Sequence, residues 1–243
     1  MGQRTLVIGD IHGANKALQQ VLERAAVTIN DKLIFLGDYV DGWSETPEVI
    51  DTLIQLKASH NCVFIQGNHD ELCLEWLNTQ DDNEQWLFHG GKATVDAYQN
   101  VSPEKVTIHK EFLEHLELYH IDENNRLFLH AGFTNQHGVT REYFSKMFYW
   151  DRTLWEMAIA LDASIPKDSP MYPKRLQHYK EIFIGHTPTM RIGKSTPVNA
   201  ANVWNVDTGA AYVNPLTIMD VETKEFWQSD PVNILYPNEN GRN

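Results

Sequence analysis

The sequence is poor in cysteine and in basic residues, and it has no long apolar run. Its two cysteines, Cys62 and Cys73, are too few for a disulfide framework. Lys and Arg number 20 against 33 Asp and Glu, and the formal net charge of -13 argues against a general affinity for nucleic acid or anionic membranes. No apolar stretch approaches the length of a membrane span, and the N-terminus has no signal-peptide pattern. We therefore expect a cytoplasmic protein with neither nucleic acid nor membrane as a partner, and the oligomeric state stays open.

Length and composition indicate one folded unit. The chain has 243 residues, of which 42% are hydrophobic and 22% charged, as in ordinary globular proteins. A chain of this length can bury one large core without a second domain. We predict a single domain over residues 1–243.

The stretch GDYVDG, residues 37–42, follows the apolar run 33–36. Such a run predicts a buried strand, and the flanking glycines predict an abrupt turn. Asp38 would then leave the end of a core strand, where open α/β sheets place their ligand sites. The nearest basic residues in sequence are Lys32 and Lys57, so a metal ion is the expected partner of the carboxylate. The alternative is an exposed, Asp-rich turn.

Two further strands end in polar residues of the same kind. The run that ends at Ile8 is followed by GDIHG, in which Asp10 and His12 would point the same way in an extended segment. The run 62–65 is followed by GNHD, which brings Asn68 and His69. His69 is the first candidate for an acid or base, because histidine titrates near neutral pH.

The rest of the chain alternates in the same way. Helical periodicity dominates residues 70–120, which we interpret as a helical cap inserted into an α/β fold. The pattern of strand and histidine returns in HAG, with His130, and in GHT, with His186. Residues past Pro231 are expected to be irregular. Three histidines whose spacing suits no metal-facing stripe are expected at the surface: His109, His115 and His120.

The motifs GDIHG, GDYVDG, GNHD, HAG and GHT, in this order, resemble the calcineurin-like metallophosphoesterases, and within them the phosphoprotein phosphatase branch. The segment 86–94 resembles one in bacterial serine/threonine protein phosphatase-like members. The resemblance implies a four-layer fold, in which a central β-sandwich is flanked by helices. It also implies two divalent metals, with manganese as the first expectation and iron or zinc as alternatives.

The resemblance further implies roles for individual residues. Asp38 matches a carboxylate that bridges both metals, His69 matches the general acid, and Asp41 matches the carboxylate that orients His69. The remaining matched metal ligands are Asp10 and His12 for the first metal, and Asn68, His130 and His186 for the second.

The implied reaction is hydrolysis of phosphate monoesters by a hydroxide that two metals activate. The expected partner is a phosphorylated substrate, either a phosphoprotein or a small phosphoester. The alternative enzyme is a nucleotide or dinucleoside polyphosphate hydrolase. A non-catalytic scaffold with the same fold is a third hypothesis.

One departure from the family pattern concerns phosphate binding. The family has VDRG where this chain has Gly42 and Trp43 after Asp41, so an arginine that normally grips the phosphate is missing. Arg152 matches a second family arginine, and we predict that it binds substrate, with Trp150 anchoring its loop by burial. The alternative is a surface ion pair of Arg152 with Glu156.

Overall fold

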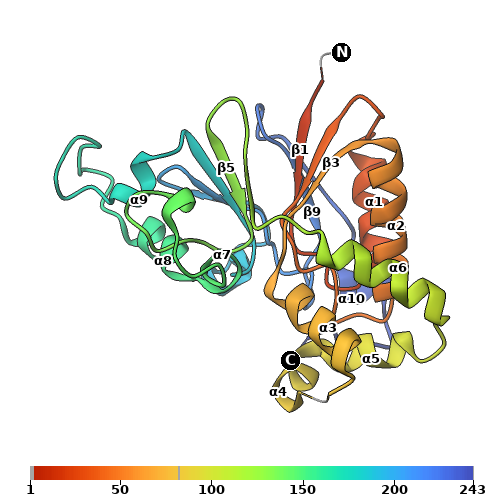
Figure 1. Ribbon diagram of the computed structural model, residues 1–243. Coiled ribbons are helices and arrows are strands. Elements are labelled where there is room, and N and C mark those ends of the chain that lie inside the picture. Colours follow the sequence, from red (N-terminus) through yellow and green to blue (C-terminus); the bar gives the residue numbers. More distant parts are fainter. Residues whose placement is uncertain (1–2, 82, 243) are drawn as a thin grey trace.

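Two five-stranded sheets pack face to face, and helices cover the outer face of each (Figure 1). The computed structural model describes residues 3–81 and 83–242. The first sheet has the order β10-β9-β1-β2-β3, with the strands β1 (Thr5–Ile8), β2 (Lys32–Phe35), β3 (Asn61–Phe64), β9 (Thr217–Asp220) and β10 (Phe226–Gln228). The second has the order β4-β5-β6-β8-β7, with the strands β4 (Tyr119–Ile121), β5 (Arg126–Leu129), β6 (Glu181–Ile184), β7 (Val198–Ala200) and β8 (Val203–Asn205). The expected α/β sandwich is confirmed.

The central strands of each sheet are parallel, which sets the position of the site. β1, β2 and β3 run parallel in the first sheet, as do β5, β6 and β8 in the second. Short antiparallel strands complete the edges of both sheets. Because parallel strands end at one edge of a sheet, the loops after them are neighbours in space.

Strand alternation builds the four layers. Successive side chains on a strand point to opposite faces. In β1, Val7 therefore faces the second sheet, while Leu6 and Ile8 face the helices of the first. In β5, Phe128 points inward and stacks on Phe183 of β6, with ring centroids 4.9 Å apart.

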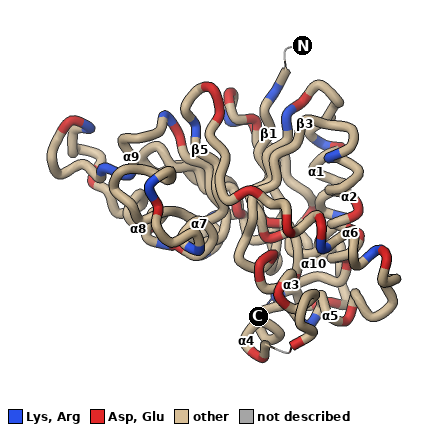
Figure 2. The backbone as a smooth tube through the Cα atoms, in the orientation of Figure 1, with Lys and Arg blue, Asp and Glu red and all other residues tan. Residues whose placement is uncertain are grey.

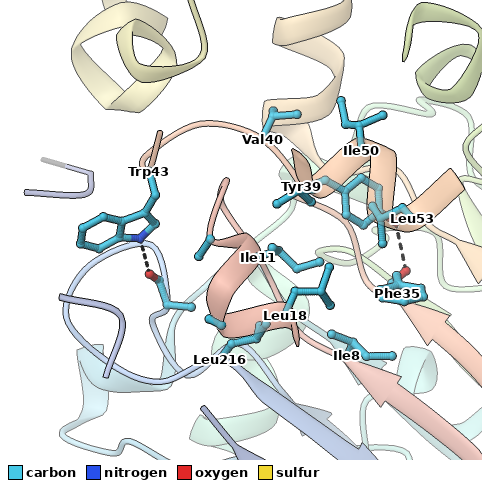
Figure 3. Packing of buried hydrophobic residues seen from close by; sticks show 14 of the residues in the cluster. Ile8, Ile11, Leu18, Phe35, Tyr39, Val40, Trp43, Ile50, Leu53 and Leu216 are labelled. Carbon is cyan, nitrogen blue, oxygen red and sulfur yellow. Dashed lines mark hydrogen bonds between the residues drawn. The ribbon is translucent and has the colours of Figure 1, made fainter. Parts of the chain in front are cut away.

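Helices of the first half cover the first sheet. Leu18 of α1 and Leu53 of α2 pack into the same cluster as Ile8 and Phe35 (Figure 3). The helical segments between β1 and β4 are α1 (Asn15–Arg24), α2 (Thr46–Ser59), α3 (Asn68–Thr79), α4 (Glu84–Trp86), a widened turn η1 (Leu87–Gly91), α5 (Lys92–Tyr98) and α6 (Pro103–Glu114). The last five of them occupy most of the segment that was expected to be a helical cap.

Shorter helices cover the second sheet. The later helical segments are η2 (Val139–Arg141), α7 (Met147–Trp150), α8 (Thr153–Ala160), α9 (Lys174–Gln177), η3 (Thr189–Ile192) and α10 (Val232–Leu235). α7, α8 and α9 lie on the outer side of this sheet (Figure 1). No helix in the described part of the chain is long and apolar enough to cross a membrane.

One expectation from the sequence is wrong, and another holds only in part. His109 is buried rather than at the surface, and its ring nitrogens contact the Tyr98 hydroxyl (2.8 Å) and Asp51 (3.1 Å). The segment after Pro231 begins with the short helix α10 and is irregular over 236–242, and Tyr236 stacks on Trp43 at 5.3 Å. In both cases a polar stretch is fixed by packing against a part of the chain distant in sequence.

Candidate active site

The predicted site residues gather where the parallel strands of both sheets end. Asp10 follows β1, Asp38 follows β2 and Asn68 follows β3. His130 and His186 follow β5 and β6 of the second sheet. All five are buried, with exposed fractions of 7% or less. The cluster therefore lies at the junction of the two sheets.

The Asp38 carboxylate is at the centre of the cluster. Its Oδ2 lies 3.4 Å from Nε2 of His12 and 3.5 Å from Nε2 of His130. Its Oδ1 accepts a hydrogen bond from the backbone N–H of His69 (2.9 Å). One carboxylate oxygen thus faces imidazoles from the two different sheets, the position that a shared ligand needs.

Two sets of ligand atoms meet at Asp38. The first is Asp10, His12 and Asp38, and the second is Asp38, His130 and His186. Within each set, the ligand atoms lie within 4.8 Å of one another. Asn68 adds an amide oxygen 3.2 Å from His130 Nε2. The structure therefore brings together all the predicted metal-ligand residues: Asp10, His12, Asp38, Asn68, His130 and His186.

The histidine tautomers favour a cation in the cluster. Nδ1 of His12 lies 3.1 Å from the Val40 carbonyl, and Nδ1 of His130 lies 2.8 Å from the Leu36 carbonyl. A carbonyl oxygen only accepts, so each Nδ1 carries a proton and the lone pair of each neutral ring is on Nε2. Both lone pairs face Asp38, another acceptor. Positive charge near these nitrogen and oxygen atoms, from a proton or a metal ion, relieves that repulsion.

The electrostatics of the cluster agree. Burial and the neighbouring Asp207 raise the pKa of Asp10 well above its usual value. Burial also acts against the Asp38 carboxylate, but the facing imidazoles hold its pKa well below the usual range. Despite burial, Asp38 and Asp10 raise the pKa of His130 to about 10. The cluster thus favours added positive charge.

A buried oxygen of Asp10 indicates where a metal fits. Oδ1 of Asp10 has no hydrogen-bond partner among the described residues, and the His186 ring turns its Nδ1 toward the cluster, 3.1 Å from Nε2 of His130. Burying such a polar atom without a partner is costly. Together with the carboxylate and imidazole donors, these atoms suit divalent ions such as manganese, iron or zinc.

The backbone of the site is held in an uncommon conformation. His12, Asp38, Asp41 and His186 have φ values of 52°, 52°, 72° and 66°. Non-glycine residues seldom adopt this left-handed region, and those that do gather at functional sites. The side chain of Asp70 holds one of these turns, because it accepts hydrogen bonds from the backbone N–H groups of Asp38 and Tyr39 (both 2.8 Å). Asp70 is the last residue of GNHD, but the motif alone did not indicate this role.

His69 and Asp41 form a buried pair beside the cluster. Nδ1 of His69 donates to Oδ2 of Asp41 at 2.5 Å. Asp41 also accepts hydrogen bonds from the indole N–H of Trp86 (2.6 Å) and the hydroxyl of Thr94 (2.7 Å). Trp86 and Thr94 are the first and last residues of the segment 86–94. That segment therefore fixes the carboxylate that orients His69.

A pocket of about 490 Å³ opens beside Asn68 and His69. Arg152 lines it, and its Nη1 donates to the Thr187 hydroxyl (3.2 Å). The ion pair of Arg152 with Glu156 is not found among the ion pairs of residues 3–81 and 83–242. The expected anchoring by burial of Trp150 is wrong, because Trp150 is 41% exposed and lines the same pocket.

Two further arginines line this pocket and were missed by sequence reasoning. Arg191 lies in η3, soon after the GHT motif, and Arg242 lies in the polar C-terminal segment. Arg191 could have been suspected from its closeness to His186. Nothing in the sequence near Arg242 indicated a site.

A calcineurin-like phosphoesterase family model matches residues 3–213, so the chain belongs to this family, as its motifs indicated. It is a hydrolase that acts on phosphate esters. Among curated relatives, the bis(5'-nucleosyl)-tetraphosphatase PrpE [asymmetrical] of Oceanobacillus iheyensis is 26% identical over 90% of this chain and 89% of its own length. PrpE of Anoxybacillus flavithermus is 29% identical over 88% of each chain.

Solved structures share the fold at low identity. A metallophosphoesterase from Sphaerobacter thermophilus has a TM-score of 0.58 at 17% identity, over 95% of this chain and 89% of that one. A serine/threonine phosphatase from Saccharomyces cerevisiae has a TM-score of 0.60 at 15% identity, over 94% of this chain and 80% of that one.

Proposed function

We propose that this phosphoesterase holds two divalent metal ions and hydrolyses dinucleoside polyphosphates. Asp10 and His12 would hold one ion, His130, His186 and Asn68 the other, and Asp38 both. Bound ions in such a site neutralise phosphate charge and activate water for attack. The Asp10 oxygen that lacks a partner, and the imidazole nitrogens of His12 and His130 that face the Asp38 oxygen, support this assignment.

His69 would protonate the leaving oxygen. Its Nδ1 is bound to Asp41, so its Nε2 is the nitrogen left to deliver a proton to substrate. The buried Asp41 carboxylate keeps the ring oriented, since it is itself held by Trp86 and Thr94. A positioned acid of this kind contributes about 10² to 10⁴ in rate.

The pocket beside His69 is the main support for dinucleoside polyphosphates as the substrate class. It is lined by Arg152, Arg191 and Arg242, and by the aromatic rings of Trp150 and Tyr212. Several guanidinium groups suit a chain of phosphates better than a single phosphoryl group, and aromatic rings can stack on a nucleobase. The names of the relatives that span nearly the whole chain support the same substrate class.

Phosphate monoesters, including phosphoproteins, are the second candidate. The segment 86–94, which resembles that of bacterial protein phosphatases, contacts Asp41 directly through Trp86 and Thr94. Because this contact supports proton transfer, it suits either leaving group, a nucleotide or a serine alkoxide.

A substrate comparison tests the proposal. The manganese-loaded protein should hydrolyse diadenosine tetraphosphate with a kcat/KM at least about ten-fold above that for a phosphoserine peptide or p-nitrophenyl phosphate. Chromatography of the products would separate ATP plus AMP from two ADP. The variant Asp38→Asn, prepared in the same way, controls for contaminating phosphatases. Faster hydrolysis of the phosphopeptide would contradict the proposal and favour the second candidate.

A further inference from the structure

Arg242 fills the space beside Gly42. A Cβ atom added to Gly42 would lie 3.2 Å from Cγ of Arg242, and Gly42 has a φ of +85°. The arginine stem therefore runs along the position where the family pattern has its missing arginine side chain. Its Nη1 lies 3.4 Å from Nε2 of His12, inside the cluster of predicted metal ligands.

The C-terminal segment 237–242 is fixed where it passes the site. Glu239 accepts hydrogen bonds from the backbone N–H (3.0 Å) and the hydroxyl (2.8 Å) of Ser44. The backbone N–H of Arg242 donates to the Ala211 carbonyl (2.8 Å). Arg242 lines the same pocket as Leu72 of α3 and Trp86 of α4, near the C label in Figure 1.

The guanidinium is oriented as well as placed. Nε of Arg242 donates to the His89 carbonyl in η1 (3.0 Å), and the guanidinium carbon lies 5.7 Å from the ring centre of Tyr212. These contacts use Nε and one face of the guanidinium group. Nη1 stays directed at the cluster, where a fork of donors suits phosphate oxygens.

Among the described residues, the arginines of the pocket lack carboxylate partners, so the pocket favours binding of an anion. Acidic positions are spread over the whole molecule, which has a net charge of -13 (Figure 2). Yet within the described part of the chain, the arginines that form ion pairs with carboxylates are Arg4, Arg24, Arg126 and Arg175. The three arginines of the pocket are not among them, and burial, Arg191 and Arg242 lower the pKa of Arg152.

We propose that Arg242 binds the substrate phosphate in place of the arginine missing at position 42, so that the C-terminal segment forms part of the active site. The inference rests on the proposed phosphoesterase site but not on the nucleotide as substrate. A guanidinium next to a metal ligand is favourable when a phosphate lies between the two positive centres. Lys92, which lines a pocket together with Gly42, is exposed and forms an ion pair with Asp96 (2.7 Å).

The test compares phosphate binding by four variants. Arg242→Met keeps an apolar stem beside Gly42 but removes the guanidinium. Gly241→Ala keeps Arg242 but displaces it, because a Cβ there would lie 2.6 Å from the Ala211 carbonyl oxygen at a φ of +67°. Arg242→Lys keeps the charge without the fork, and Arg141→Ala removes an exposed charge outside the pocket as a control.

The readouts are the dissociation constant of inorganic phosphate by calorimetry, the metal content per chain, and kcat and KM for p-nitrophenyl phosphate. For Arg242→Met and Gly241→Ala we expect phosphate affinity and kcat/KM to fall about ten-fold or more, with normal metal content. Arg242→Lys should recover part of the affinity, and Arg141→Ala should match the wild type.

Equal phosphate affinity in the wild type and Arg242→Met would overturn the proposal, and so would wild-type affinity in Gly241→Ala. Because phosphate and an aryl ester are the probes, the outcome is independent of the nucleotide assignment. If the Arg242 variants lose phosphate binding but the wild type does not cleave dinucleotides, the role of Arg242 stands. The proposed substrate class would then be refuted.

Discussion

At Asp38 a left-handed backbone conformation turns one carboxylate toward two histidines from different sheets. Such a conformation costs about 1 to 3 kcal/mol and persists where its surroundings enforce it. Asp70 supplies part of that enforcement through the backbone N–H groups of Asp38 and Tyr39. Burial and the Asp38 charge raise the pKa of Asp70 to about 7, whereas the hydrogen bonds from the backbone N–H groups favour its ionised form.

Replacing the central carboxylate should empty the metal site. Asp38→Asn keeps the shape of the side chain but removes the charge that two cations would share. We expect fewer than one metal per chain by elemental analysis and loss of turnover by about 10³ or more, at an unchanged circular dichroism spectrum. Asp96→Asn, an exposed carboxylate paired with Lys92, is the matched control. A variant that retains both metals would refute the shared-ligand role of Asp38.

The role of His69 can be read from the leaving group. If His69 donates a proton, His69→Asn should slow alkyl phosphates, which have poor leaving groups, by about 10² or more. Hydrolysis of p-nitrophenyl phosphate, whose leaving group needs little protonation, should slow much less. His115→Asn, at an exposed histidine of the helical region, is the control. An equal loss for all esters would instead indicate a structural role for His69.

At the scale of single elements, the strands and the site residues that follow them could be predicted from the sequence. Each apolar run, such as 33–36, is followed directly by its motif, such as GDYVDG, so one local pattern predicts both the strand and the site residue after it. His109 was mispredicted because its burial depends on α6 packing beside Tyr98 and Asp51. Arg242 was missed because its position comes from contacts with Ala211 and His89, which lie far away in sequence.

An ion pair connects the start of β1 to the turn before β2, and its contribution to stability depends on pH. Nε and Nη2 of Arg4 donate to the two oxygens of Asp31 (3.0 and 2.7 Å), and Asp31 is 3% exposed. The Arg4 hydrogen bonds lower the pKa of Asp31 to about 2. Because the folded pKa lies below the unfolded one, this stabilisation is present above about pH 4 and is lost as the pH falls toward 2.

Asp31→Asn should therefore lower the free energy of unfolding by about 2 kcal/mol at pH 7. The difference from wild type should shrink as the pH falls from 4 toward 2. Urea unfolding at pH 7, 5 and 3 measures it, with the exposed Asp168→Asn as the control. A difference that does not change with pH would show that packing, rather than the charge of Asp31, accounts for the loss.

At the scale of the whole molecule, the metal cluster joins the two sheets. Asp10, His12 and Asp38 follow strands of the first sheet, and His130 and His186 follow strands of the second. The apolar layer between the sheets, which includes Val7 and Phe128, packs them together without using the cluster. Bound metal would thus add a second connection across an interface that is already formed.

Metal removal should consequently lower thermal stability without unfolding the chain. At a metal concentration of about 100 times Kd, binding contributes about 2.7 kcal/mol. For a chain of this size that corresponds to a rise in Tm of about 5 to 10 °C. We expect this rise when manganese is added to chelator-treated protein, measured by scanning calorimetry. Asp96→Asn should show the full rise, whereas Asp38→Asn should lose most of it because it lacks the carboxylate that faces both sheets. If Asp38→Asn gained as much stability from manganese as the wild type, the metal would be binding elsewhere, and the connection between the sheets would rest on the apolar layer alone.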